Sequence, residues 1–118
     1  MVGIVGDWRH QMMKKIIAVD FDGTLVKNDY PEISNPNLRL IRFIMRNRDK
    51  YIFILWTCRH DKDLEEAIDY LWFNFRLKFD YVNENVPELI QKFGDTRKIY
   101  ADYYIDDKNI INNFYEKI

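Results

Sequence analysis

Two aspartates separated by one residue close an apolar run near the start of the chain. The stretch reads "IIAVDFDGTLV", with Asp20 and Asp22 followed by Gly23 and Thr24. In an extended segment, residues two positions apart point to the same side, so both carboxylates face one way. Two carboxylates are costly to desolvate unless a cation or a chemical role compensates for them. The pattern predicts a site for a hard divalent cation, Mg²⁺, that bridges to a phosphate.

The residues after the aspartates and at later strand ends extend this candidate site. Gly23 lets the chain bend without a Cβ clash, and we expect the bend to expose backbone N–H groups that bind an anion. Thr57 follows the apolar run "YIFILW", and Asn83 follows "FDYV". Ligands of parallel sheets bind beyond the carboxyl ends of the strands, so we expect these side chains to converge there.

The elements that must position these residues follow from apolar periodicity and turn residues. Strands are expected over residues 16–20, 51–57 and 79–83, with further strand character within 98–107 and with Asp106 and Asp107 at its end. The alternation of strands with helices predicts an α/β fold, a three-layer Rossmann-like parallel sheet flanked by helices.

Four helices are expected between and after the strands. Asn35 is predicted to cap a helix from Pro36 to about residue 47, with Met45 among its inward-facing residues. Asp61 is predicted to cap a strong amphipathic helix. A short helix should begin at Pro87 and end near residue 94, and residues 109–118 should form a closing helix.

Length and composition indicate one globular domain. The chain has 118 residues, of which 47% are hydrophobic and 31% charged, and its net charge is −1. This balance excludes a bulk attraction to nucleic acid or to an acidic membrane. We assign residues 15–118 to one domain and regard residues 1–14 as an N-terminal extension of unknown role. A single cysteine, Cys58, and the lack of a long apolar segment favour a cytoplasmic protein.

Four short motifs resemble those of the haloacid dehalogenase (HAD) superfamily of phosphotransferases. "DFDGTL" after an apolar strand is similar to the first motif, Thr57 in "ILWT" to the second, and "YIDD" to the fourth. Lys98 in "DTRKIYADYYIDD" resembles the third, with Arg97 and Lys92 as weaker candidates. The resemblance covers residues 16–109. The intervals between the motifs are filled by the expected elements, so the resemblance implies a small member without a cap domain.

The resemblance implies a role for each matching residue. Asp20 would be the nucleophile that forms an aspartyl-phosphate, and Asp22 would be the general acid and base. Thr57 would donate its hydroxyl to a phosphoryl oxygen, while Lys98 would offset negative charge. Because halide needs no proton when it leaves, the presence of Asp22 favours a phosphomonoester hydrolase over a dehalogenase.

The resemblance also implies a cofactor and a substrate class. Mg²⁺ would be held by Asp20, the backbone carbonyl of Asp22, Asp106 and, through water, Asp107. The expected partner is a phosphorylated substrate, such as a nucleotide, a sugar phosphate, a nucleic-acid end or a phosphoprotein. We expect no membrane partner, and a homo-oligomer is compatible with the sequence. The residues expected to contact the substrate are Gly23, Thr24, Arg59, His60 and Asn83.

Two other functions fit parts of this pattern. A non-catalytic phosphoacceptor or phospho-ligand-binding module, like a response-regulator receiver, also joins acids, a threonine and a lysine on an α/β sheet. Receivers place adjacent acids after the first strand and the acceptor after the third, whereas here Phe21 separates the acids and the third strand ends in Asn83. A pseudo-enzyme that binds a partner at the same edge is the other alternative, and the intact acids argue against it.

Overall fold

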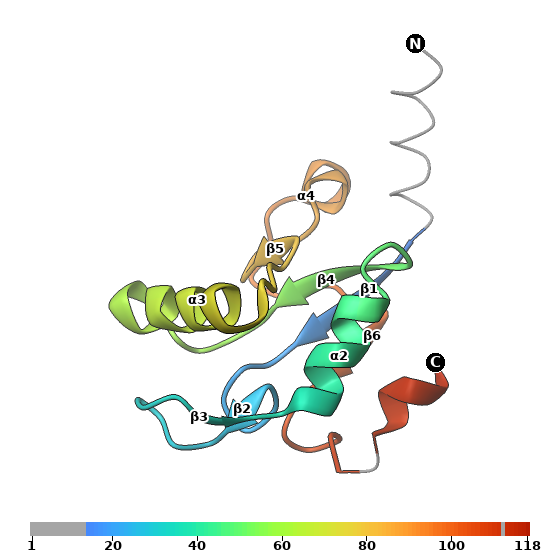
Figure 1. Cartoon of the computed structure of the whole chain (residues 1–118). Coiled ribbons are helices and arrows are strands. Elements are labelled where there is room, and N and C mark those ends of the chain that lie inside the picture. Colours follow the sequence, from blue (N-terminus) through green and yellow to red (C-terminus); the bar gives the residue numbers. More distant parts are fainter. Residues whose placement is uncertain (1–13, 112) are drawn as a thin grey trace.

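The computed structural model describes residues 14–111 and 113–118 (Figure 1). The N-terminal extension expected over residues 1–14 therefore lies outside the described residues, except for Lys14. Within the described part, no helix has the length and apolar character that a membrane crossing requires.

A parallel four-stranded sheet forms the centre of the structure. Its order is β5-β4-β1-β6, and the strands are β1 (Lys15–Val19), β4 (Tyr51–Leu55), β5 (Tyr81–Val82) and β6 (Tyr103–Ile105). All three neighbouring pairs are parallel. The chain is thus an α/β protein with a Rossmann-like sheet, as the alternation of elements predicts. The strand order reverses beside β1, because the chain moves outward through β4 and β5 and then returns to β6.

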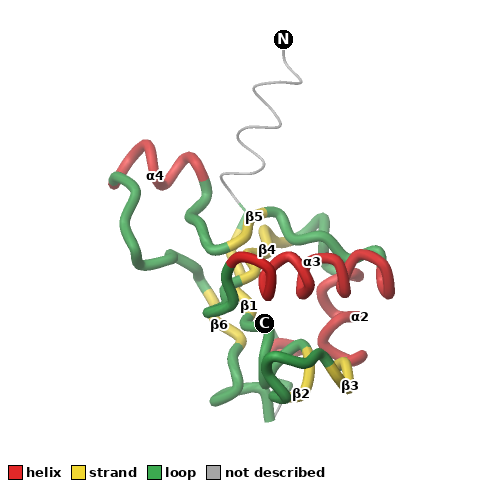
Figure 2. Tube along the Cα trace, turned by 90° about the vertical axis from the view of Figure 1, so that its left-hand side faces the viewer, coloured by secondary structure: helices red, strands yellow, loops and turns green. Residues whose placement is uncertain are grey.

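Two helices cover one face of the sheet. They are α2 (Leu38–Arg46) and α3 (Asp61–Phe75), which both lie on the right-hand side of the sheet in Figure 2. Alternate residues of β1 and β4 point toward them, because successive strand residues face opposite sides. The resulting core contains Ile17, Val19, Phe53, Leu55, Leu40, Ile41, Ile44, Ala67 and Leu71, all nearly inaccessible to solvent.

The opposite face is covered by the return segment from β5 to β6. This segment includes α4 (Pro87–Phe93), which lies on the other side of the sheet from α2 in Figure 2. The second core is smaller and consists of Ile16, Ala18, Ile52, Ile54, Val86, Ile99 and Ala101. Crossover connections are right-handed, so reversing the direction of travel moves the connection to the other face.

An aspartate stands before each of the two edge strands. Asp80 donates its amide to the Phe53 carbonyl at 3.0 Å and accepts the Phe53 amide with its carboxylate at 2.8 Å. Asp102 makes the same pair of contacts with Ile16, both at 2.8 Å. These carboxylates complete the hydrogen bonding of the central strands where the short edge strands have not yet begun.

A short antiparallel pair, β2 (Val26–Lys27) and β3 (Ser34–Pro36), follows the first strand. Residues 28–33 connect the two strands and are called the flap below. The predicted C-terminal helix is wrong, because residues 114–117 form only one 3-10 turn, η1 (Phe114–Lys117). That turn places the buried Tyr115 ring 4.9 Å from the ring of Phe43 on α2.

The helix starts differ from the sequence prediction in their capping residues. Asn37, not Asn35, caps α2, because its side chain accepts the Leu40 amide at 3.1 Å. Pro36 belongs to β3, and Met45, expected in the core, is 43% exposed. His60 occupies the N-cap position of α3, and its side chain makes no capping hydrogen bond, so the predicted cap at Asp61 is also wrong.

We predict that Asn37→Ala lowers the free energy of unfolding by about 1 kcal/mol, because both the cap and the 3.1 Å contact from the Asn37 side-chain amide to the Thr24 carbonyl are lost. Urea denaturation followed by circular dichroism measures this change. Asn35→Gly is the matched control, since Asn35 has a φ of 37° that glycine adopts freely. A larger loss for Asn35→Gly than for Asn37→Ala would restore the original cap assignment.

Candidate functional site

The carboxyl ends of three neighbouring strands meet at a small cavity. Its volume is about 220 Å³, and it is lined by Asp20, Trp56, Thr57, Cys58, Asp106 and Asp107. The sheet ladder continues past the strand ends and fixes this convergence: the Asp20 amide donates to Ile105 at 2.9 Å, and the Trp56 amide donates to Val19 at 2.8 Å. Four of the predicted site residues are therefore brought together at the edge that the sequence indicated.

Asp20 is the electrostatically unusual group of this cavity. Burial raises the pKa of its carboxyl from 3.8 to about 6, against the lowering effect of the Phe21 amide, which donates to Asp20 Oδ1 at 2.8 Å. Charge repulsion from Asp107, Asp22 and Asp106 contributes to the same rise. All the charged groups that contribute to this pKa shift are negative, so the site has a local excess of negative charge that a cation would relieve.

Thr57 is held so that its hydroxyl proton is free to be donated. Its amide donates to the Asn83 side-chain oxygen at 2.8 Å, and its Oγ1 accepts the Arg59 amide at 3.1 Å. Because the hydroxyl oxygen already accepts a hydrogen bond, its own proton can point into the cavity. Asn83 does not line the cavity itself; it positions Thr57 from the loop after β5.

The acidic pair after β6 is anchored differently at its two positions. Asp106 begins a turn in which its Oδ1 accepts the Lys108 amide at 2.9 Å and its own amide donates to Asn109 at 3.0 Å. Asp107 lies against the loop after β1: a Cβ added to Gly23 would come within 3.1 Å of the Asp107 Cβ. Gly23 is therefore required both by its φ of 82° and by this close approach.

The expectation that the turn at Gly23 exposes amides for an anion is wrong. The Gly23 amide donates to Val26 at 2.8 Å, and those of Thr24 and Leu25 donate to Phe21 at 3.2 and 2.9 Å. These donors are used inside the turn. Thr24 itself is 2% exposed, and its Oγ1 has no hydrogen-bond partner within the described residues.

Arg59 forms a buried ion pair with Asp22. Its Nε and Nη2 donate to the two carboxylate oxygens of Asp22 at 2.8 and 2.9 Å, a bidentate arrangement. Arg59 is 2% exposed, so the prediction that it contacts substrate at the mouth of the site does not fit its burial. Asp22 is not among the described residues that line the cavity, because Arg59 holds its carboxylate to one side.

The same guanidinium fastens the flap to the rest of the domain. It lies 4.9 Å from the ring centre of Tyr30 and 5.1 Å from that of Phe21, and it donates to the Pro31 carbonyl at 3.1 Å. The Tyr30 hydroxyl in turn donates to Asp63 on α3 at 2.7 Å. Arg59 thus joins the loop of the first motif, the flap and α3 in one cluster.

The remaining predicted site residues lie away from the cavity. Lys98 is exposed, and its backbone carbonyl accepts a hydrogen bond from Asn85 at 3.0 Å. Its side chain does not line the cavity, so the role implied for it by resemblance stays a prediction. His60 is also exposed, and its Nδ1 lies 3.1 Å from Asp61 Oδ2.

The residues offer part of a magnesium site. Within the described chain, no three acidic, histidine or cysteine side chains are gathered closely enough to form a metal site by themselves. Mg²⁺, however, is commonly held by one or two carboxylates completed by water and by substrate phosphate. The raised pKa of Asp20 and the acidic surroundings of its carboxyl fit such an incomplete oxygen site.

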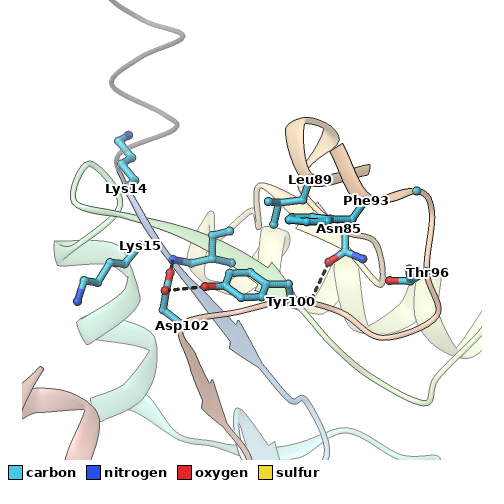
Figure 3. Close-up of a pocket in the computed structure, with 10 residues that line it drawn as sticks. Lys14, Lys15, Asn85, Leu89, Phe93, Thr96, Tyr100 and Asp102 are labelled. Atoms are coloured by element: carbon cyan, nitrogen blue, oxygen red, sulfur yellow. Dashed lines mark hydrogen bonds between the residues drawn. The ribbon is translucent and has the colours of Figure 1, made fainter. Parts of the chain in front are cut away.

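A larger hollow of about 460 Å³ lies at the other end of the sheet (Figure 3). Several polar groups that line it are hydrogen-bonded to other parts of the protein. The Tyr100 amide donates to Asn85 at 2.6 Å, and the Tyr100 hydroxyl donates to Asp102, which also accepts the Ile16 amide. Asn85, Tyr100 and Asp102 thus bind one another, and we place the functional site at the smaller cavity, where Asp20, Thr57, Asp106 and Asp107 meet.

Sequence reasoning missed two features of the site. Trp56 and Cys58 flank Thr57 and line the cavity, but the pattern of the motif singles out only the threonine. The burial of Arg59 depends on Phe21 and Tyr30, which are distant in sequence. The order Thr-Cys-Arg after a buried strand was the available signal, and it does not by itself distinguish a buried arginine from an exposed one.

Comparison with known proteins identifies a similar solved structure. No family model matches the sequence, and no curated protein is significantly similar to it. The fold is similar to a solved structure described as a conserved protein coded by a locus of Bacteroides thetaiotaomicron, with a TM-score of 0.72. The two sequences are 32% identical, and the match covers 88% of this chain and 91% of the other. The chain belongs to the same protein family as this conserved Bacteroides protein.

Proposed function

We propose that the protein is a Mg²⁺-dependent phosphomonoester hydrolase of the HAD type without a cap domain. The observation that carries this proposal is the shared cavity of Asp20, Thr57, Asp106 and Asp107, in which burial and neighbouring acids raise the pKa of Asp20 to about 6. A carboxylate of this kind, beside a free hydroxyl donor and further acids, suits the attack on a phosphoryl group whose charge a cation offsets.

Asp20 acts as the nucleophile in the proposed reaction. One of its carboxylate oxygens forms a bond to phosphorus while the bond from phosphorus to the ester oxygen breaks, which leaves an aspartyl-phosphate and an alcohol. The Phe21 amide at 2.8 Å fixes Oδ1 of Asp20, so Oδ2 is the oxygen free to attack. Thr57 donates its hydroxyl proton to a phosphoryl oxygen and holds the group in line.

Asp22 supplies and removes the protons. It gives a proton to the departing ester oxygen and then takes one from the water that attacks the aspartyl-phosphate, which releases phosphate and restores Asp20. Both carboxylate oxygens of Asp22 are bound to Arg59 in this structure. The proposed role therefore requires Asp22 to leave Arg59 during turnover by rotation of its side chain toward the cavity.

The expected cofactor is Mg²⁺, which when bound neutralises the charge of the phosphoryl group and orients it. Asp20, Asp106 and the backbone carbonyl of Asp22 would hold it, with Asp107 acting through water. The absence of a cap among the described residues leaves this edge of the sheet open. Lys98 stays a candidate for the charge-balancing cation.

A second candidate is a phosphoacceptor module that carries a long-lived aspartyl-phosphate without rapid hydrolysis. The observation that favours it is the bidentate Arg59 contact, which keeps Asp22 away from the cavity where water would be activated. The two functions share the phosphorylation of Asp20 and differ in its lifetime. Multiple turnovers per protein molecule support the hydrolase, whereas a single stoichiometric phosphorylation supports the acceptor.

We predict that the wild-type protein releases phosphate from 4-nitrophenyl phosphate with Mg²⁺, and that Asp20→Asn abolishes this release because the amide cannot attack phosphorus. Phosphate release with and without excess EDTA is the measurement. Asp69→Asn, at an exposed position of α3, is the matched control and should keep full activity. Inactivity of the wild type across a broad phosphoester panel with Mg²⁺ would refute the hydrolase.

A second prediction concerns the pH dependence of stability. The pKa of Asp20 in the folded protein is about 6, above its ordinary 3.8, so the folded state binds the proton more tightly than the unfolded state. Stability therefore falls as pH rises from about 4 to about 6, and the penalty is complete above that range. The difference between 3.8 and about 6 corresponds to about 3 kcal/mol, and solvent screening of this partly exposed carboxyl lowers the expected effect. Because Asp20→Asn removes the penalty, the variant should be more stable than wild type by about 2 kcal/mol at pH 7.5.

Urea denaturation at pH 4 and pH 7.5 measures this effect. At pH 4 the two proteins should be nearly equal in stability, because Asp20 is protonated in the wild type. Saturating Mg²⁺ should stabilise the wild type at pH 7.5 and should have little effect on Asp20→Asn, which has lost one ligand charge. If the wild type and Asp20→Asn were equally stable at pH 7.5 as well as at pH 4, the raised pKa of Asp20 would be contradicted.

A third prediction separates the structural and chemical roles of the ion pair. Asp22→Asn should abolish turnover and also lower the free energy of unfolding by about 3 kcal/mol, because the buried Arg59 loses its charged partner. Arg59→Met should be at least as destabilising and should expose the flap to trypsin at Lys27. Thermal melts and limited proteolysis test both variants; unchanged stability in both would show that the pair does not hold the domain together.

A further inference from the structure

Trp56 is an exposed indole inside the candidate active site. It follows β4 directly, is 39% exposed and lines the same cavity as Asp20 and Thr57. Single exposed apolar residues are ordinary on protein surfaces, so exposure alone would carry no argument. Among the large apolar side chains that the structure describes as exposed, however, Trp56 alone lines this cavity.

The sheet register places Trp56 beside the proposed nucleophile. Val19 pairs with Leu55, and the Trp56 amide donates to the Val19 carbonyl at 2.8 Å, so the parallel ladder continues to Trp56 and Asp20. Neighbouring strands lie about 4.8 Å apart, and residues at matching positions face the same side of the sheet. The indole and the Asp20 carboxylate are therefore side by side.

The indole is held in place from one side. The ring of Tyr104 meets it edge-on, with 5.5 Å between ring centres and 63° between ring planes. The Tyr104 hydroxyl is itself fixed, because it donates to the Ile99 carbonyl at 2.6 Å and accepts the Ala101 amide at 3.1 Å. Trp56 is thus a preorganised surface whose remaining exposed part borders the cavity.

We infer that Trp56 is a stacking platform for an aromatic ring carried by the substrate. This inference rests on the proposed function, since Asp20 must hold the phosphoryl group for the ring to reach the indole. Because Trp56 lies one strand away from Asp20, the ring must stand close to phosphorus. The substrate class that fits is a phosphomonoester whose phosphate is attached to an aromatic ring directly or through one methylene. A nucleoside 5′-phosphate fits less well, because a ribose separates its base from the phosphate.

The surroundings of the cavity favour the same class. Apart from Trp56 and Cys58, its lining consists of three carboxylates and Thr57, which serve the phosphoryl group and its cation. The indole is the large apolar surface available to the organic part of the substrate. Offset or edge-to-face contact between two aromatic rings adds attraction beyond simple burial, so a flat aromatic group gains more here than a saturated ring of equal size.

The test compares benzyl phosphate with cyclohexylmethyl phosphate, which differ in the aromaticity of the ring and have alkoxide leaving groups of the same type. We expect the wild type to favour benzyl phosphate in kcat/KM by about threefold to tenfold. Trp56→Leu should reduce this ratio to about one, whereas Trp56→Phe should retain most of it. Equal values for both esters in the wild type, or an unchanged ratio in Trp56→Leu, would overturn the inference.

A binding measurement separates this inference from the hydrolase proposal. Titration calorimetry with the Asp22→Asn variant, which keeps Asp20 and the expected ligands of Mg²⁺, should show the same preference for benzyl phosphate in the presence of Mg²⁺, and Trp56→Leu in that background should remove it. The variants with and without Trp56→Leu should bind inorganic phosphate with similar affinity, which shows that the phosphate site is intact. Preferential binding without any turnover by the wild type would defeat the hydrolase and support the platform. Turnover without ring preference, or tighter binding of adenosine 5′-phosphate than of benzyl phosphate, would overturn the proposed substrate class.

Discussion

The hydrogen-bonded pairing of β1 with β4 on one side and β6 on the other is the constraint on which the site depends. The ladder continues beyond the strands through the amides of Asp20 and Trp56, so the first residues of three different loops are held at one edge of the sheet. Asp102 secures the opposite end of the same ladder by binding the Ile16 amide. The chemistry at the cavity therefore relies on backbone geometry more than on contacts among the acidic side chains, which repel one another.

That repulsion distinguishes the two aspartates of the first motif. Asp22 has a full bidentate partner in Arg59, whereas the charges that act on Asp20 are all acidic and its partner is the neighbouring amide of Phe21. The two carboxylates thus have opposite environments: the negative charge of Asp22 is compensated by Arg59, and that of Asp20 is not. Under the proposed function, the difference suits a nucleophile whose charge a cation would compensate and a general acid whose carboxylate is bound to an arginine in the absence of substrate. Because the same arginine also binds the flap, one side chain joins Asp22 to the flap.

Much of the architecture could be predicted from the sequence because it rests on local patterns. The apolar runs that end in polar residues gave the parallel strands and the edge where Asp20, Thr57 and Asp106 meet. The predictions were wrong where residues distant in sequence determine the structure. Asn37 caps α2 because its side chain also reaches the Thr24 carbonyl, and no local pattern distinguishes it from Asn35. Arg59 is buried because two aromatic rings from other segments enclose it, although arginines are usually exposed.

The central claim is that Asp20 accepts a phosphoryl group, and beryllium trifluoride tests it most directly because this ion binds an aspartate carboxylate as a mimic of the aspartyl-phosphate. Fluorine NMR of the wild-type protein with Mg²⁺ and beryllium trifluoride should show distinct resonances of the bound ion, which vanish when Mg²⁺ is removed or when Asp20 is replaced by asparagine. Bound resonances that persist in Asp20→Asn, or that fail to form in the folded wild type, would contradict the account.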